Sequence, residues 1–297
     1  MSGKTVSLGA PYRWLGESFA ICRAHPRVIF GAAALLMAVA LLPSVLQLLV
    51  EAALQPSMAV RWVLQAVFSI MALIVFPPIV GGFYRITHAL HEGRPANAFD
   101  LFAVFQDGAA ALRLIVTNLI FVVISIVVLL GLALAFGGQP LLDFIRAMGE
   151  LQPGATSLPP FPDGLMALMS MLMILGLVIM TAQGLATANV ALSATPLLAA
   201  TGVGFGAALR NIAAFLLFYI PLAVISFVVA MILVLVVALL AGMLSVVNPM
   251  LAAALIAPVS LVLVLLLYAL MFTFYYHAWR DTLGPGAAIE NDHHLIA

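Results

Sequence analysis

The sequence predicts an all-α integral membrane protein, a six-helix bundle with short amphipathic helices on its cytoplasmic surface. Of its 297 residues, 65% are hydrophobic and only 7% are charged, against roughly 25% charged residues in a soluble domain. Residues 164–209 and 211–279 contain no formal charge. Because a soluble fold needs a solvated polar face in segments of this length, the composition favours a membrane protein.

Six apolar segments are long enough to cross a bilayer, which takes about 20 helical residues because backbone polar groups cannot stay unpaired in hydrocarbon. The fifth is too long for a straight span and is expected to tilt or protrude. After it, Asn248-Pro249 is a turn signal, and proline suits the first turn of the next helix. The predicted spans are 28–50, 62–84, 114–136, 164–188, 212–244 and 249–276.

The basic residues of the connecting segments predict the orientation. Nine lie on one side of the predicted membrane: Lys4, Arg13, Arg23, Arg27, Arg85, Arg94, Arg113, Arg210 and Arg280. Only Arg61 and Arg146 lie on the other side. The side with nine is therefore expected to be cytoplasmic. The prediction is a cytoplasmic N-terminal segment (1–27), one transmembrane domain (28–276) and a cytoplasmic C-terminal tail (277–297).

Three short segments on the cytoplasmic side are predicted to lie at the membrane interface. Before the first span, Tyr12, Leu15, Phe19 and Cys22 recur at helical spacing. Before the third, Asn97 can cap a helix whose third residue is Asp100. Before the fifth, Gly202–Leu209 is uncharged and glycine-rich, which favours a bent interfacial or shallow re-entrant segment. The expected interfacial anchors are Trp14, Phe19, Phe99, Phe102 and Phe105.

An internal repeat is indicated by two matching tetrapeptides. Ala110-Ala111-Leu112-Arg113 recurs as Ala207-Ala208-Leu209-Arg210, and an asparagine follows each near the start of a span. The predicted unit is a short cytoplasmic helix followed by a transmembrane hairpin, repeated three times. On the far side, Gly137–Asp163 is the one sizeable loop, and its prolines predict an extended second half.

The pair His88 and His91 is the arrangement closest to a metal site. Two imidazoles at i,i+3 share a helix face and could bind a transition metal with Glu92 nearby. The order differs from the His-Glu-x-x-His of zinc proteases, and polar residues belong where a span leaves the membrane. We therefore expect an ordinary solvated helix end, with no metal, no cofactor and no enzymatic activity.

Neutral polar residues occur inside the predicted spans. Gln65, Asn118 and Gln183 are expected to form hydrogen bonds between helices, each contributing about 1 kcal/mol or less. No Asp, Glu, Lys or Arg is predicted at mid-depth, where ion-coupled carriers usually place them. The glycines of Gly202–Gly206 are expected to permit close backbone packing rather than nucleotide binding, because no strand precedes them.

Several motifs carry a family resemblance. They are Pro77–Tyr84, His91-Glu92-Gly93, Phe99-Asp100-Leu101-Phe102, Arg210–Phe215 and Trp279-Arg280-Asp281. The chain resembles a family of bacterial multi-span inner-membrane proteins, the BPSS1780-like family. It is more distantly similar to the DUF975 proteins and to the membrane domain of glycerophosphodiester phosphodiesterases. The resemblance implies a bacterial inner-membrane location but no site residue, and no phosphodiesterase domain is found in this chain.

Two functions stay open at this stage. The first is a non-catalytic scaffold or subunit of a membrane assembly, since charged groups and catalytic constellations are absent from the predicted spans. The alternative is a facilitator or exporter of a lipid-like molecule, favoured by the repeat, by prolines in the spans and by the methionines of 164–188. A water-lined cavity at mid-depth would favour transport, and an apolar lateral groove would favour a partner. The expected partners are the lipid bilayer, copies of this chain or other membrane proteins, and no nucleic acid.

Overall fold

The described part of the chain folds into helices. A computed structural model describes residues 3–135, 138–149, 164–193, 195–245 and 249–285, and no strand occurs in these ranges. The helices are α1 (Ala10–Ala24), α2 (Pro26–Leu54), α3 (Met58–His91), the 3-10 helix η1 (Ala98–Gln106), α4 (Gly108–Ala135), α5 (Gly138–Gly149), α6 (Leu165–Leu192), α7 (Leu197–Arg210), α8 (Ile212–Ser245) and α9 (Pro249–Thr282). The predicted all-α membrane fold is confirmed.

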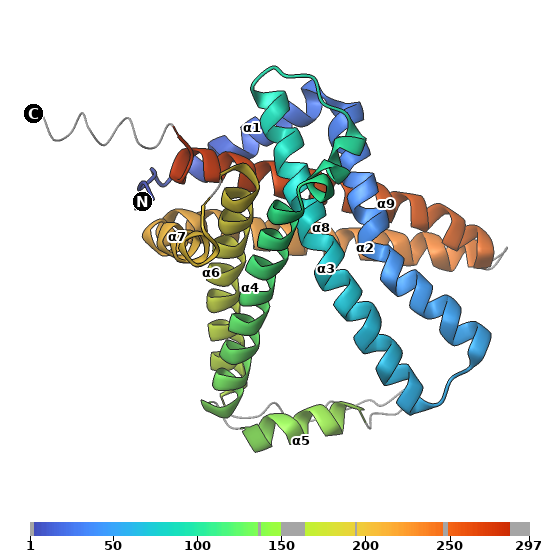
Figure 1. The fold of residues 1–297 in the computed structure, drawn as a ribbon. Helices are drawn as coiled ribbons and strands as arrows, with labels where there is room; N and C mark the ends of the chain where they lie inside the picture. The colour runs from blue at the N-terminus through green and yellow to red at the C-terminus, as the bar shows by residue number, and fades with distance from the viewer. Residues whose placement is uncertain (1–2, 136–137, 150–163, 194, 246–248, 286–297) are drawn as a thin grey trace, which may run out of the picture.

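The order of elements is that of the predicted repeating unit, a short helix followed by a long hairpin. Helix α1 precedes the hairpin α2/α3, η1 precedes α4/α6, and α7 precedes α8/α9 (Figure 1). In the described part of the chain, five helices are long and apolar enough to cross a membrane, or six if the bent pair α7 and α8 counts as one span. Within the described residues, each of the six predicted spans coincides with one long helix, apart from Gly164, which is the N-cap of α6.

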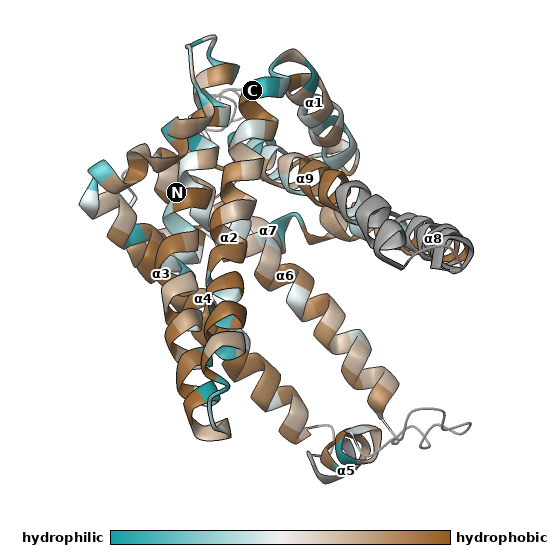
Figure 2. Ribbon diagram, turned by 90° about the vertical axis from the view of Figure 1, so that its right-hand side faces the viewer, coloured by the Kyte–Doolittle hydropathy of each residue, from teal (hydrophilic) through white to brown (hydrophobic). Residues whose placement is uncertain are grey.

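All three hairpins meet at one end, which we call the hub. It consists of α1, η1, α7 and the adjoining ends of α3, α4, α6 and α9 (residues 77–91, 108–117, 181–192 and 269–282). Hydrophilic residues gather at this end, while the arms that extend from it are mostly hydrophobic (Figure 2). The nine basic residues predicted on one side lie in or beside the hub, whereas Arg61 and Arg146 lie on α3 and α5, toward the far ends of the arms.

Trp14 of α1 lies at the centre of the hub. Its side chain is 0% exposed, and its ring lies 5.7 Å from those of Phe215 and Phe274. Phe274 in turn stacks on Phe218 at 5.0 Å. The prediction of Trp14 as an interfacial anchor is therefore wrong, because burial here gives the ring aromatic neighbours from α8 and α9 and gives its N–H an acceptor.

Helix α1 divides its apolar residues between two faces. Tyr12 and Phe19 are each 50% exposed, so Phe19 is free to act as the predicted interfacial anchor. Cys22, predicted on the same face, is instead buried with Trp14. The sequence offers two apolar stripes, and the hub buries the one with the larger aromatic side chain.

The segment before α4 is capped as predicted. Asn97 Oδ1 accepts from the backbone N–H of Phe99 at 2.8 Å, and Asp100 Oδ2 accepts from the N–H of Asn97 at 2.8 Å. The helix that follows is 3-10, in which residues i and i+3 form one row. Leu101 and Val104 form the buried row.

The three phenylalanines of η1 form its outer row. Phe99 is 70% and Phe105 43% exposed, whereas Phe102 is partly buried against the hub core. The predicted anchors of this helix therefore lie on a surface that can face the lipid interface, although Phe102 also packs inward.

Two glycines let the short helices lie directly on the long ones. A Cβ at Gly82 of α3 would lie 2.1 Å from the carbonyl oxygen of Leu101 in η1, and one at Gly204 of α7 would lie 2.6 Å from that of Ala182 in α6. The expected close backbone packing therefore occurs at Gly204. Around Gly202, by contrast, a Cβ would meet open space.

The segment Gly202–Leu209, predicted as bent or re-entrant, is part of the regular helix α7. The bend comes after it, where α7 and α8 meet at 72°. Asn211 fixes this junction: its side chain accepts from the N–H of Val6 at 2.8 Å and donates to the carbonyl of Lys4 at 3.0 Å. The bend therefore lies at the C-terminal end of this segment and not within it. Its interfacial or re-entrant placement stays a prediction.

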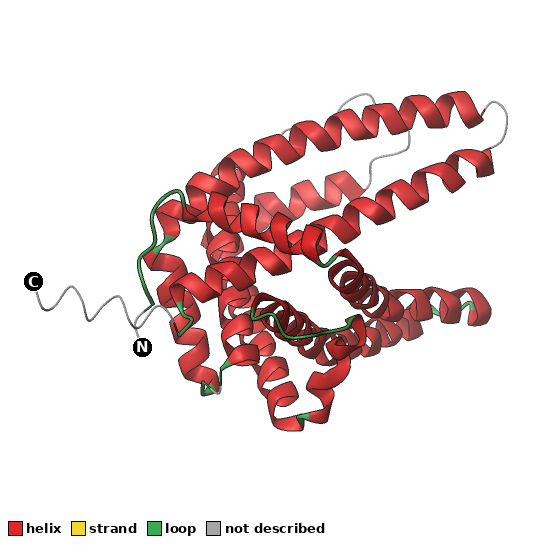
Figure 3. Ribbon diagram, turned by 90° about the horizontal axis from the view of Figure 1, so that it is seen from above, coloured by secondary structure: helices red, strands yellow, loops and turns green. Residues whose placement is uncertain are grey.

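Beyond the hub the hairpins separate. The α8/α9 hairpin leaves at a steep angle to α4 and α6, as the views in Figures 1 and 3 both show. Apolar side chains such as Trp62, Val127 and Leu267 are 68%, 63% and 64% exposed on the arms. These faces need lipid or another apolar surface against them.

Some predicted features fall outside the described residues. These are the proline-rich half of the far-side loop (150–163), the turn at 246–248 and the end of the tail (286–297). The first half of the loop forms α5. Helix α9 continues past the predicted end of the last span to Thr282, because its last turns pack into the hub.

Candidate functional site

Two reciprocal ion pairs join α1 to α9 in the hub. Glu17 of α1 accepts from Arg280 of α9 at 2.8 Å, and Arg13 of α1 donates to Asp281 of α9 at 2.5 Å. The buried Trp14 N–H also donates to Asp281, at 2.8 Å. Exposed ion pairs contribute about 0–1 kcal/mol each, so the buried indole bond and the aromatic packing carry most of this contact.

His277 lies beside the first pair and is 2% exposed. Its Nδ1 lies 2.9 Å from Glu17 Oε2. Neither ring nitrogen makes a hydrogen bond of good geometry in the described structure. A buried imidazole next to Arg280 is favoured in its neutral form. We therefore assign His277 to packing rather than to an ion pair.

The structure gives the predicted metal candidates other partners. His88 Nδ1 lies 3.1 Å from the Tyr276 hydroxyl and its Nε2 lies 3.2 Å from Glu92. His91 Nε2 lies 2.9 Å from the Arg280 guanidinium, a cation that would repel a metal ion there. Among the residues with described positions, no three His, Cys, Asp or Glu side chains are grouped for a metal.

Glu92 itself belongs to the solvated end of α3. A hydrogen bond from Arg94 lowers the pKa of its carboxyl below the usual range. Glu92 is therefore ionised near neutral pH, as expected of a polar residue where a helix leaves the membrane.

A second contact inside the hub, between the end of α9 and α6, was not predicted from the sequence. Trp279 of α9 donates to Asn189 of α6 at 3.1 Å, and both side chains are buried. Arg85 of α3 donates to the carbonyl of Ala191 in α6 at 3.1 Å. The aromatic run Phe272–Trp279, followed directly by Arg and Asp, was the available signal that the end of α9 packs inside the protein.

The three predicted polar residues of the arms all bond across helices. Gln183 of α6 donates to Asn118 of α4 at 2.8 Å. Gln65 of α3 accepts from Gln47 of α2 at 2.9 Å and donates to Ser69 at 3.2 Å. These bonds join neighbouring arms through neutral groups, each worth about 0.6 kcal/mol on average in membrane proteins.

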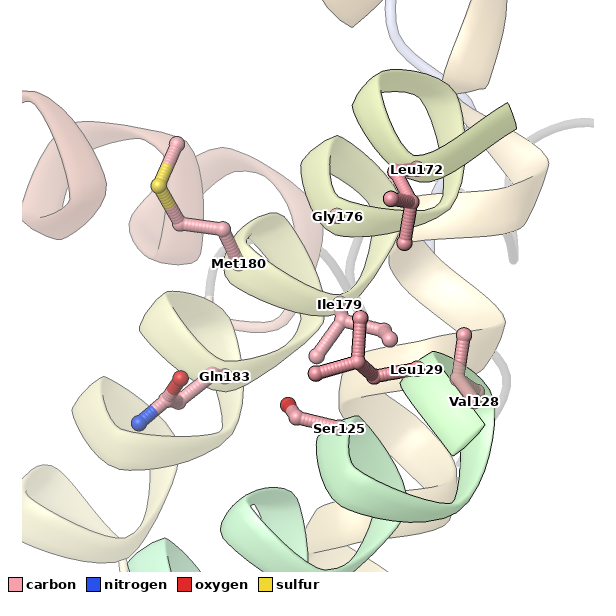
Figure 4. Close-up of a pocket in the computed structure, with 8 residues that line it drawn as sticks. All are labelled: Ser125, Val128, Leu129, Leu172, Gly176, Ile179, Met180 and Gln183. Carbon is pink, nitrogen blue, oxygen red and sulfur yellow. The ribbon is translucent and has the colours of Figure 1, made fainter. Parts of the chain in front are cut away.

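A small cavity of about 190 Å³ lies between α4 and α6 (Figure 4). Its polar side chains are Ser125 and Gln183, and the remaining lining is apolar or glycine. Ser125 donates to the carbonyl of Phe121 in its own helix, and Gln183 donates to Asn118. The polar groups of this cavity are therefore already engaged.

A larger cavity of about 460 Å³, which we call the wedge, lies where α4 separates from α2 and α3. Its lining is apolar except for Ser69 and Asn118, and it includes Leu73, Phe76 and Val122. The Asn118 oxygen accepts from Gln183, but its amide NH₂ makes no hydrogen bond within the described chain. The wedge thus contains an unused donor in an apolar setting.

The lateral groove is the third cavity, with a volume of about 590 Å³ between α1, α6, α8 and α9. Its lining is almost entirely apolar and includes Leu222, Leu267 and Met271. Tyr219 and Tyr275 supply hydroxyl groups at its hub end, where they bond to each other at 2.9 Å. Of the two outcomes weighed from the sequence, the apolar lateral groove is present.

These features define an all-α, multi-pass membrane protein whose described polar groups mostly hold helices together. No family model, curated protein or solved structure matches the chain. The resemblance to the BPSS1780-like and DUF975 families therefore stays a prediction.

Proposed function

We propose that this protein is a non-catalytic scaffold or subunit of a membrane assembly. The hub holds three hairpins at one end, and the wedge receives a transmembrane helix of a partner protein. The observation that supports this most is the Asn118 amide, a donor without an acceptor among the described residues, in a cavity whose lining is apolar except for Ser69 and Asn118 itself. In hydrocarbon such a group drives helix association, because its alternative is to remain unsatisfied.

The proposed location is the bacterial inner membrane, with the hub and both termini on the cytoplasmic side. This orientation rests on the nine basic residues in or beside the hub against two toward the far ends of the arms. The partner helix would carry a backbone carbonyl or polar side-chain acceptor at the depth of Asn118. Small residues in the wedge, such as Ala40 and Ala72, allow a close approach.

Site-specific photocrosslinking in native membranes tests the proposal. A photoreactive amino acid at Val122, which lines the wedge, should give a discrete protein adduct larger than the monomer. The same probe at Leu119, one turn away, 47% exposed and outside the wedge lining, should give mainly lipid adducts. Equal protein adducts at both positions would show non-specific contact and contradict the wedge as the site.

A matched pair of variants separates the free donor from the bond inside the protein. Asn118→Leu removes both, whereas Gln183→Leu breaks the same bond and leaves the Asn118 donor in place. Asn118→Leu should reduce the Val122 adduct roughly threefold to tenfold, and Gln183→Leu should not. An equal loss with both variants would mean that α4–α6 packing, and not partner binding, was measured.

The second candidate function is movement of a lipid-like molecule, which the prolines in the spans and the methionines of 164–188 favour. It predicts lipid adducts alone at Val122 and no discrete protein adduct from any wedge position.

A further inference from the structure

We infer that the lateral groove binds one acyl chain of a membrane phospholipid, with the ester carbonyl of that chain at Tyr275. The groove lies between α6, α8 and α9, on a different face from the wedge between α2, α3 and α4. The inference is therefore independent of the proposed partner, and either can fail without the other.

The hydroxyl groups at the polar end of the groove are not all paired within the described residues. Tyr219 donates to Tyr275 at 2.9 Å, and among the described residues no acceptor takes the Tyr275 proton with good hydrogen-bond geometry. Thr181, which neighbours both tyrosine hydroxyls, is 1% exposed, and its hydroxyl makes no hydrogen bond of good geometry. Since buried hydroxyls are costly when unpaired, a ligand oxygen at this end would complete the cluster.

Tyr275 is held firmly in place by α6. A Cβ at Gly184 would lie 2.6 Å from the Tyr275 ring, so only glycine leaves room for the ring on this helix. The ring is 4% exposed, and its hydroxyl lies at the groove. The donor is thus positioned before any ligand arrives, which lowers the cost of binding.

The apolar part of the groove has the length of one bilayer leaflet. From Tyr275 to Val264, both of which line it, α9 advances by roughly 16 Å at 1.5 Å per residue. Half of the hydrocarbon core is about 15 Å thick. An acyl chain of about that length whose carbonyl lies at Tyr275 would therefore fit along α9, away from the hub.

The groove is open to the membrane along its side. Leu267 is 64% and Met271 38% exposed, so a lipid can enter laterally without any movement of the helices. The volume of about 590 Å³ lies within the roughly 300–1,000 Å³ typical of ligand sites. Its walls are apolar apart from the hydroxyl groups of Tyr219, Tyr268 and Tyr275, and they suit an acyl chain ester better than a charged or water-soluble ligand.

The test uses the purified full-length protein in liposomes that contain a phosphatidylglycerol with a diazirine midway along one acyl chain. After illumination, mass spectrometry should find adducts on the α9 segment 264–271 about fivefold more often than on α4 around Val127, which is 63% exposed to lipid. Even labelling of the two segments would mean ordinary solvation by lipid and overturn the inference.

Two variants sharpen the result. Ala223→Trp places a large ring in the groove and should abolish the enrichment, whereas Val127→Trp adds the same bulk to a lipid-facing position and should leave it unchanged. Tyr275→Phe keeps the ring and removes the donor, so the enrichment should fall roughly twofold, as expected for one neutral hydrogen bond. Undiminished enrichment with either groove variant would contradict the assignment.

A partner protein in the groove is the competing occupant. A photoreactive residue at Leu267 in native membranes should give lipid adducts, and a discrete protein adduct there would overturn the inference even if the wedge prediction held.

Discussion

Replacing Trp14 by Ala should lower the free energy of unfolding by about 3–5 kcal/mol, the range for a fully buried large aromatic residue. The ring is 0% exposed between Phe215 and Phe274, and its N–H donates to Asp281. The loss would appear as a lower midpoint in unfolding by sodium dodecyl sulfate, followed by circular dichroism.

Phe19→Ala on the same helix is the matched control. Phe19 is 50% exposed, so its truncation should change the stability of the detergent-solubilised protein by about 1 kcal/mol or less. Trp14→Phe should fall between the two, because it keeps an aromatic ring and loses the hydrogen bond. If Phe19→Ala were as damaging as Trp14→Ala, the assignment of Trp14 to the core of the hub would be wrong.

Gly82→Ala should destabilise the protein by about 3 kcal/mol or more, at the upper end of overpacking effects. The added methyl carbon would lie 2.1 Å from the carbonyl oxygen of Leu101. Because the backbone of η1 cannot rotate away as a side chain can, the whole of η1 would have to move away from α3. The measurement is the same unfolding midpoint, together with protease sensitivity near Ala98–Gln106.

Gly176→Ala provides the opposite expectation. At Gly176, in α6, a Cβ meets nothing within 4 Å, so alanine should stabilise the helix by about 0.5–1 kcal/mol. A neutral Gly82→Ala would contradict the direct backbone contact between η1 and α3.

The helices of this fold could be predicted from the sequence because each depends on residues within its own segment of the chain. An apolar run of about 20 residues is a span regardless of its neighbours, and the Asn97 cap depends only on Asp100, three residues on. The three short helices before three hairpins could also be inferred in order. In each case the physical cause and the signal occupy the same stretch of chain.

The hub could not be predicted in detail because its partners are far apart in the chain. Trp14 has the composition of an interfacial anchor, and only the approach of Asp281, 267 residues away, makes it a core residue. The bend at Asn211 likewise depends on the backbone of Lys4 and Val6.

The candidate sites divide in the same way. The polarity of Asn118 and Gln183 was visible in the sequence, but the free donor of Asn118 depends on which of its atoms Gln183 uses. The groove exists because of the angle between α6 and the α8/α9 hairpin, and no local sequence pattern determines that angle. Tyr219 and Tyr275 were therefore not selected from the sequence.

The central claim is that the three hairpins extend from one hub, which lies on the cytoplasmic side of the membrane. Thiol labelling tests this claim most directly. In a Cys22→Ser background, single cysteines would replace Ser7 and Ala199, exposed at the hub, and Ser57 and Met148, exposed at the far ends. A membrane-impermeant maleimide should label the two far-end positions in intact cells with permeabilised outer membranes. It should label the two hub positions only in inverted vesicles. Labelling of a hub position and a far-end position from the same side would contradict the account.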